Sequence, residues 1–204
     1  MSKNALATVA ASQDLRTRIG DAIVGLVLQV PPSEENKIAQ PEVRARALGR
    51  SAARQASLIA GTLALPVGFL GWLTILPELV GVWKLQAQMV SDIAAVYGKS
   101  ATLGREQMLY CLFKHVSAQL FRDVVVRVGE RVVIQGATLG FIQSAAKTLG
   151  VKVTQKVIGK GVSRFVPLVG AVGVGAYAYF DTTQVAKTAI ELFAREIVPN
   201  PTDF

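Results

Sequence analysis

The chain has 204 residues, of which 51% are hydrophobic and 18% are charged. This apolar content can fill the core of one domain and excludes intrinsic disorder over most of the chain. A single cysteine excludes a disulfide framework and a single histidine excludes an ordinary Cys/His zinc site, so we expect no metal and no cofactor. The net charge of +8 favours an anionic membrane surface or an acidic partner.

The N-terminal region predicts one helix followed by a linker. Its start has one lysine and no continuous apolar run, which predicts a cytoplasmic protein without a targeting segment. Residues 13–28 have apolar positions at helical spacing, and Pro31 and Pro32 end this amphipathic helix. We therefore divide the chain into residues 1–40, a helix and its linker, and residues 41–204, a helical domain.

Residues 55–77 carry no formal charge and, at about 1.5 Å per residue, are long enough to span a bilayer core. Proline and glycine interrupt this run, so we predict two shorter helices that meet near residues 66–71. The interrupting residues are Pro66, Gly68, Gly71 and Pro77. A helix is then predicted over residues 78–97, with Gly98 at its C-cap.

The second half of the chain predicts further helices. Thr102 is expected to cap a helix that runs to about Ala118, with Glu106 in its first turns. Residues 120–135 are rich in valine and also suit a β-hairpin, but their charges are spaced as on a helix, so we predict a helix. Helices are also predicted over residues 138–149, 151–163 and 182–197. The predicted fold class is all-α: a compact multi-helix bundle with two apolar helical hairpins broken by proline and glycine.

Acidic residues are missing from two long windows of the chain. Four arginines and no acid lie between Glu42 and Glu78, and six cations and no acid lie between Glu130 and Asp181. Within each window a row of cations recurs every four residues and so shares a helix face, where the repulsion destabilises an isolated helix. The arginine row is Arg46, Arg50 and Arg54, and the lysine row is Lys152, Lys156, Lys160 and Arg164.

An uncharged run containing proline and glycine follows each row, at residues 63–72 and 165–180. A basic helix beside an apolar segment is typical of contact with anionic lipid. We therefore predict a non-enzymatic peripheral membrane or lipid-contacting protein at the inner face of the cell membrane. Two alternatives are a hydrolase that acts on a lipid or another apolar substrate, and a soluble module that binds an acidic protein. No nucleic-acid partner is expected, because the cations lack aromatic neighbours and a known binding motif.

Cys111 and His115 are the weak candidates for a catalytic pair, because they lie four residues apart on one predicted helix. Their segment is apolar, and no Asp or Asn that would orient the histidine is identifiable from the sequence. We therefore predict that both are core residues, and that replacing either with alanine lowers stability and leaves any activity largely intact.

Residues 63–100 resemble the core motif of the EcsC family. The matching residues are Leu76-Pro77, Gln86, Ile93-Ala94 and Tyr97-Gly98, followed later by Pro167, Gly170 and Ala171. This resemblance covers about residues 45–195 and implies a mostly helical, membrane-associated bacterial protein without an established reaction. It also implies structural roles for the motif prolines and glycines and for Tyr97. The chain departs from the family at Ile75, where an acidic residue is usual, and this puts in doubt any polar site that used the acid.

Overall fold

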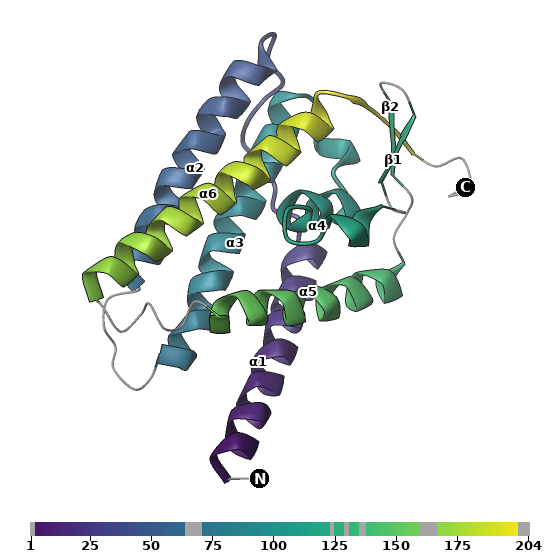
Figure 1. Cartoon of the computed structure of the whole chain (residues 1–204). Coiled ribbons are helices and arrows are strands. Elements are labelled where there is room, and N and C mark those ends of the chain that lie inside the picture. Colours follow the sequence, from purple (N-terminus) through teal and green to yellow (C-terminus); the bar gives the residue numbers. More distant parts are fainter. Residues whose placement is uncertain are drawn as a thin grey trace.

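The computed structural model describes residues 3–63, 71–122, 125–128, 131–134, 138–159 and 167–199. Within these ranges, six α-helices form the bundle (Figure 1). They are α1 (Lys3–Leu28), α2 (Pro41–Leu63), α3 (Gly71–Val96), α4 (Arg105–Phe113), α5 (Leu139–Gly159) and α6 (Pro167–Phe193). The predicted helical bundle is confirmed, with a small sheet added at one end. No helix within these ranges is both long and apolar enough to cross a membrane.

Helices α2 and α6 run antiparallel, side by side, along one edge of the molecule (Figure 1). Small residues let the two backbones approach closely. A Cβ atom added at Gly49 would lie 2.8 Å from the Ala186 Cβ, and one added at Gly175 would lie 3.0 Å from the Ser57 carbonyl oxygen. A larger side chain at either glycine would therefore separate the helices. This close pair presents one broad outer surface.

The predicted break in the first apolar run is confirmed. Helix α2 ends at Leu63, α3 begins at Gly71, and the two pack against each other; Pro66 and Gly68 lie outside the described residues. Pro77, however, does not end the run as predicted, because it lies inside α3. A proline in the second turn removes one intrahelical hydrogen bond. The apolar spacing on both sides of Pro77 continues the helix through it.

Two of the predictions for the second half of the chain, at Gly150 and at Pro167, were wrong. Helix α5 continues through Gly150 instead of dividing there. The glycine lies where α1 crosses α5 closely, since a Cβ atom added at Gly150 would lie 2.8 Å from the Arg16 carbonyl oxygen. Pro167 begins α6 instead of kinking the apolar run, and α6 continues through Gly170. Proline suits the first helical position, where its missing N–H has no intrahelical acceptor to lose.

The helix predicted over residues 120–135 was also wrong. Strands β1 (Val125–Val128) and β2 (Arg131–Ile134) pair antiparallel, and β3 (Glu196–Pro199) pairs parallel with β2. The β-branched valines favour strands, and β3 supplies a partner from a distant part of the chain. Residues 194–197, which we predicted to end the last helix, therefore lie outside α6, which ends at Phe193. The sheet lies beside one end of the bundle (Figure 1).

The main core joins the N-terminal helix to the rest of the bundle. Ile19, Ile23 and Val27 of α1 are fully buried in the same cluster as Ile93 of α3 and Leu149 of α5. The linker over residues 29–40 is non-helical, as predicted. It is attached to α3 by Ser33, whose hydroxyl donates to Asp92 Oδ1 at 2.7 Å, and by Ile38 N–H, which donates to the Val96 carbonyl at 3.2 Å.

The C-cap predicted at Gly98 is confirmed. Gly98 has a φ of +70°, a conformation in which a side chain would be strained. Its N–H donates to the Ala95 carbonyl at 2.8 Å, and the Lys99 N–H donates to the Ala94 carbonyl at 2.7 Å. These two hydrogen bonds form a Schellman motif, which ends α3 and turns the chain toward α4.

Helix α4 is shorter than predicted. Its N-cap is Gly104 rather than Thr102, and the Gly104 N–H donates to Gln107 Oε1 at 2.8 Å. Glu106 lies in the first turn, as predicted. Since α4 ends at Phe113, His115 lies in the turn that follows and does not share a helix with Cys111.

Candidate functional site

The arginine row lies on the exposed side of α2. Arg46, Arg50 and Arg54 are all solvent-exposed. Arg46 forms an ion pair with Glu42, with 2.5 Å between Nη2 and Oε1. No described residue forms an ion pair with Arg50 or Arg54, so both present a full positive charge to solvent.

The packing of α2 against α6 shows where these two arginines lie. Ser57 and Gly61 face Gly175 of α6. Arg50 lies seven residues before Ser57, and Arg54 lies seven before Gly61. Seven residues make about two helical turns, so each arginine points in nearly the same direction as its partner in the pair. The two arginines therefore lie along the border between α2 and α6.

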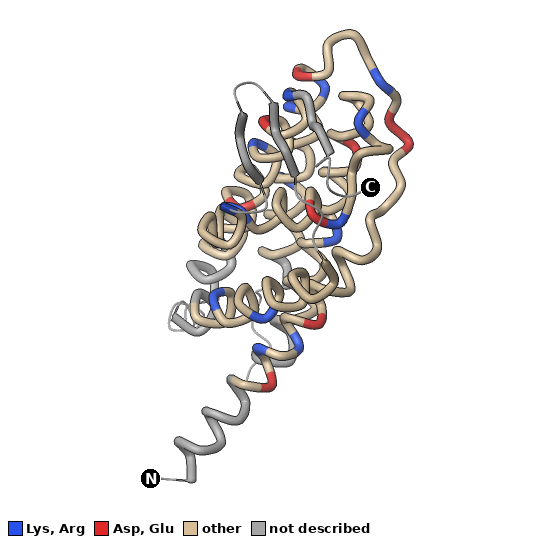
Figure 2. Tube along the Cα trace, turned by 90° about the vertical axis from the view of Figure 1, so that its right-hand side faces the viewer, with Lys and Arg blue, Asp and Glu red and all other residues tan. Residues whose placement is uncertain are grey.

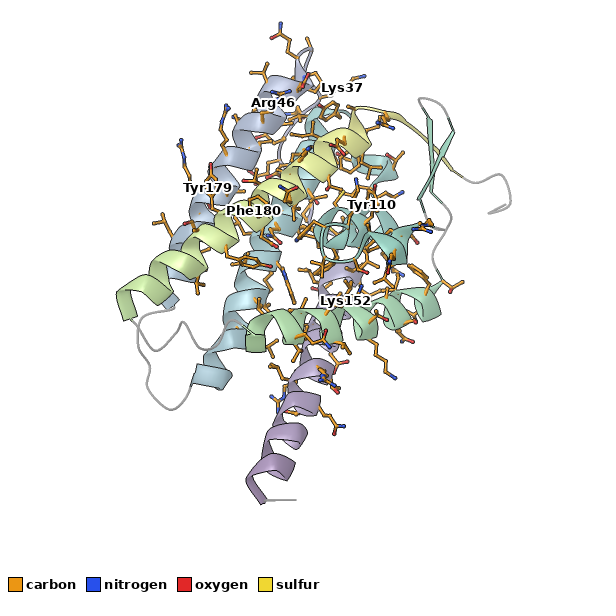
Figure 3. The ribbon with its side chains drawn as sticks, in the orientation of Figure 1. Lys37, Arg46, Tyr110, Lys152, Tyr179 and Phe180 are labelled. Atoms are coloured by element: carbon orange, nitrogen blue, oxygen red, sulfur yellow. The ribbon has the colours of Figure 1, made fainter. Side chains whose placement is uncertain are left out.

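Helix α6 adds an exposed stripe beside the arginine row. Ala176, Phe180, Thr183 and Lys187 are exposed, and their spacing of four, three and four residues places them on one face. Phe180 is 61% exposed and the adjacent Tyr179 is 41% exposed. Figure 3 labels Tyr179 and Phe180 on α6 and Arg46 on α2. This stripe contains no acidic residue.

Exposed aliphatic residues flank the arginines on α2. Val43 is 65% exposed and Leu58 is 68% exposed. Val43 lies seven residues before Arg50 and Leu58 lies four after Arg54, so both share the outward side of the helix. We name this surface the α2–α6 face; it consists of Val43, Arg46, Arg50, Arg54, Leu58, Tyr179, Phe180, Thr183 and Lys187.

Both acidic residues of α6 are paired with a basic side chain. Asp181 pairs with His115, and Glu191 pairs with Lys114 at 3.6 Å. On α2 the single acidic residue is Glu42, which is paired with Arg46. The α2–α6 face therefore has an excess of positive charge.

The lysine row does not form a comparable surface in the described part of the chain. Lys152 is half-buried and its Nζ donates to Ser117 Oγ at 2.7 Å. The side chain of Lys156, and Lys160 and Arg164 as a whole, lie outside the described residues. Figure 2 views the molecule from the side opposite to the α2–α6 edge, and both basic and acidic residues are visible there.

A polar cluster lies on the inward flank of α6 and is centred on Asp181. Its Oδ1 is 2.7 Å from His115 Nε2, and its Oδ2 accepts a hydrogen bond from Gln86 Nε2 at 2.9 Å. The Gln86 amide also donates to Thr182 Oγ1 at 3.0 Å. The Tyr177 hydroxyl donates a third hydrogen bond to the carboxylate. The cluster thus joins α3, the turn after α4, and α6.

The cluster is shielded from solvent. Gln86 is fully buried, and the side chains of His115 and Asp181 are 17% and 14% exposed. Burial, followed by the negative charge of Asp181 and the hydrogen bond to it, raises the pKa of Tyr177 to about 12. Gln86 Oε1 and His115 Nδ1 are buried and have no hydrogen-bond partner among the described residues.

Asp181 is the orienting residue for His115 that the sequence did not reveal, because the two are far apart in the chain. A histidine held by a carboxylate is part of a catalytic triad only if the other ring nitrogen serves a nucleophile. Cys111 is fully buried, and burial strongly raises the pKa of its thiol, with a small opposing effect from Lys114. The thiol therefore stays protonated and is not activated. No cluster of three or more metal-ligating side chains occurs within the described ranges.

Several described residues of the family motif lie at helix ends or in the polar cluster. Gln86 lies in the polar cluster, Tyr97 and Gly98 end α3, and Gly71 and Pro167 begin helices. Burial is the largest of the effects that raise the pKa of Tyr97.

In comparisons with known proteins, no family model, no curated protein and no solved structure matched the chain. The EcsC resemblance therefore stays a prediction.

Proposed function

We propose that the protein is a peripheral membrane protein that docks on an anionic bilayer through the α2–α6 face. The observation that carries this proposal is the pair of exposed arginines, Arg50 and Arg54, which form no ion pair with a described residue and lie between the exposed side chains of Val43 and Leu58. Cations next to apolar side chains on one helix face are typical of helices that lie in the membrane interface. The EcsC resemblance, which implies membrane association, agrees with this proposal.

The charges on this face strengthen binding to an anionic surface. Each Lys or Arg near an anionic surface contributes about 1 kcal/mol. Arg50 and Arg54 together therefore contribute about 2 kcal/mol, or about 30-fold in affinity. The attraction weakens as salt rises, since the Debye length is about 8 Å at 0.15 M.

The exposed apolar side chains favour a membrane over an acidic protein as the partner. An acidic protein would match the arginines alone, whereas a bilayer interface matches both the arginines and the apolar side chains beside them. Two antiparallel helices side by side also give an extended surface of the kind that lies flat on a bilayer. The nucleophile that the sequence offered for the hydrolase alternative, the Cys111 thiol, is buried and protonated.

Flotation with vesicles tests the proposal. The parent protein should float with vesicles of phosphatidylglycerol and phosphatidylcholine at low salt, and much less with phosphatidylcholine alone. The double variant Arg50→Gln/Arg54→Gln should lose most of the binding. A control, Arg105→Gln/Lys147→Gln, removes two exposed cations from α4 and α5 and should bind like the parent. Equal binding by the two double variants, or no preference for anionic lipid, would overturn the proposal.

A further inference from the structure

We propose that Phe180 of α6 enters the bilayer interface when the α2–α6 face docks, with Tyr179 beside it at the level of the lipid headgroups. This inference rests on the proposed function and adds which residues penetrate. It distinguishes insertion from adsorption by charge alone, because a protein held only by its arginines would leave Phe180 in water.

The exposure of Phe180 is the first observation. A phenylalanine ring that is 61% exposed leaves a large apolar area in water. It is the most exposed aromatic residue in the described chain, and the exposed Ala176, Thr183 and Lys187 share its face. The next acidic residue on this side of α6 is Glu191, three turns after Phe180, and its charge is paired with Lys114 at 3.6 Å.

The polar cluster holds the ring outward. The residues that follow Phe180 are Asp181, which is bound to His115 and Gln86, and Thr182, which is bound to Gln86. Successive residues on a helix point about 100° apart, so fixing these two toward the body of the molecule directs Phe180 away from it. These contacts fix the rotation of α6 about its axis, so Phe180 points outward from the bundle.

The chemistry of the neighbouring residues fits a bilayer interface. Aromatic rings with a polar end, such as Tyr179, favour the headgroup level, and apolar rings favour the acyl boundary below it. Lys187, two turns after Phe180, and the arginines of α2 are placed to contact phosphate groups while their aliphatic parts lie on apolar surface. We therefore expect Phe180 to lie deeper than the cations.

A site-specific fluorophore tests the depth of residue 180. The variant Phe180→Cys is labelled with an environment-sensitive nitrobenzoxadiazole; Cys111 is fully buried and should not react in the folded protein. The control is Ser144→Cys, an exposed position on α5, with the same label. On phosphatidylglycerol vesicles, the label at position 180 should brighten and be quenched by spin-labelled lipid, and the label at position 144 should not change.

An unlabelled pair of variants removes any influence of the fluorophore. Phe180→Ala should weaken binding to phosphatidylglycerol vesicles by about tenfold or more. Leu139→Ala, which truncates a residue that is 51% exposed on α5, should bind like the parent. Both positions are exposed, so circular dichroism should show that both variants are folded.

The outcomes separate the two proposals. If the parent floats but the label at position 180 stays in water and Phe180→Ala binds normally, the insertion is refuted while docking by charge stands. If the parent does not bind anionic vesicles at all, the proposed function fails and the insertion fails with it. A bright, quenched label together with weak binding of Phe180→Ala supports both.

Discussion

Replacing Asp181 with asparagine should destabilise the protein, because its carboxylate holds the polar cluster together. The carboxylate accepts from His115, Gln86 and Tyr177, three donors from different parts of the fold. An asparagine keeps one oxygen but turns an N–H group toward a donor, so at least one hydrogen bond is lost at a site that is 14% exposed.

The magnitude follows from the type of hydrogen bond. A hydrogen bond to a charged group contributes about 1.5–3 kcal/mol, and breaking a buried pair costs up to about 5 kcal/mol. Since the cluster is not completely shielded, we expect a loss of about 2–3 kcal/mol in the free energy of unfolding. At about 2–4 °C per kcal/mol for a chain of this size, the melting temperature should fall by roughly 4–12 °C.

Urea unfolding followed by circular dichroism measures this loss. The control is Asp14→Asn, which removes a carboxylate paired with Arg18 on α1, where both side chains are more than 60% exposed (62% and 64%). Exposed pairs contribute less than about 1 kcal/mol, so the control should change little. If Asp181→Asn unfolded at the same urea concentration as the parent, the polar cluster would not stabilise the contact of α6 with α3 and with the turn after α4.

Three further predictions concern single residues. Because the pKa of Tyr177 is raised to about 12, the folded protein should lose stability as the pH rises from about 10, the tyrosine value in an unfolded chain, toward 12. Tyrosinate absorbance should show that Tyr177 titrates late, and Asp181→Asn should bring its titration to lower pH. Cys111→Ala should cost about 1–3 kcal/mol through lost packing, and a thiol reagent should react with Cys111 only on unfolding. Gly98→Ala should cost about 1–2 kcal/mol in urea unfolding, because an alanine is strained at a φ of +70°, whereas Gly140→Ala on α5 should be neutral or stabilising.

Local sequence signals predicted the parts of the fold whose causes are local. Apolar spacing predicted the helices of the first half, and the position of Gly98 predicted its cap. The four-residue spacing of the arginines predicted that they share a face of α2, and all three are exposed there. Each of these features depends on residues within one helix or one turn.

The errors come from contacts between distant segments. The valines of residues 125–134 form strands because β3, more than sixty residues later, pairs with β2. The error at Pro167 is the exception, because proline suits the first position of α6 for a local reason. Gly150 was predicted to divide a helix, but it lies where α5 and α1 cross closely. The partner of His115 was missed for the same reason. Nothing in the sequence near His115 indicates that Asp181 lies opposite, although a lone acid within a long apolar, uncharged segment was a usable signal.

The salt dependence of vesicle binding is the most direct test of docking through the α2–α6 face. The dissociation constant for phosphatidylglycerol vesicles should be measured for the parent and for Arg50→Gln/Arg54→Gln, from low salt to beyond about 0.15 M. We expect the double variant to bind about 30-fold more weakly at low salt and the affinities of the two proteins to converge as salt rises. Affinity that is the same for both proteins, or that does not change with salt, would contradict docking through the α2–α6 face.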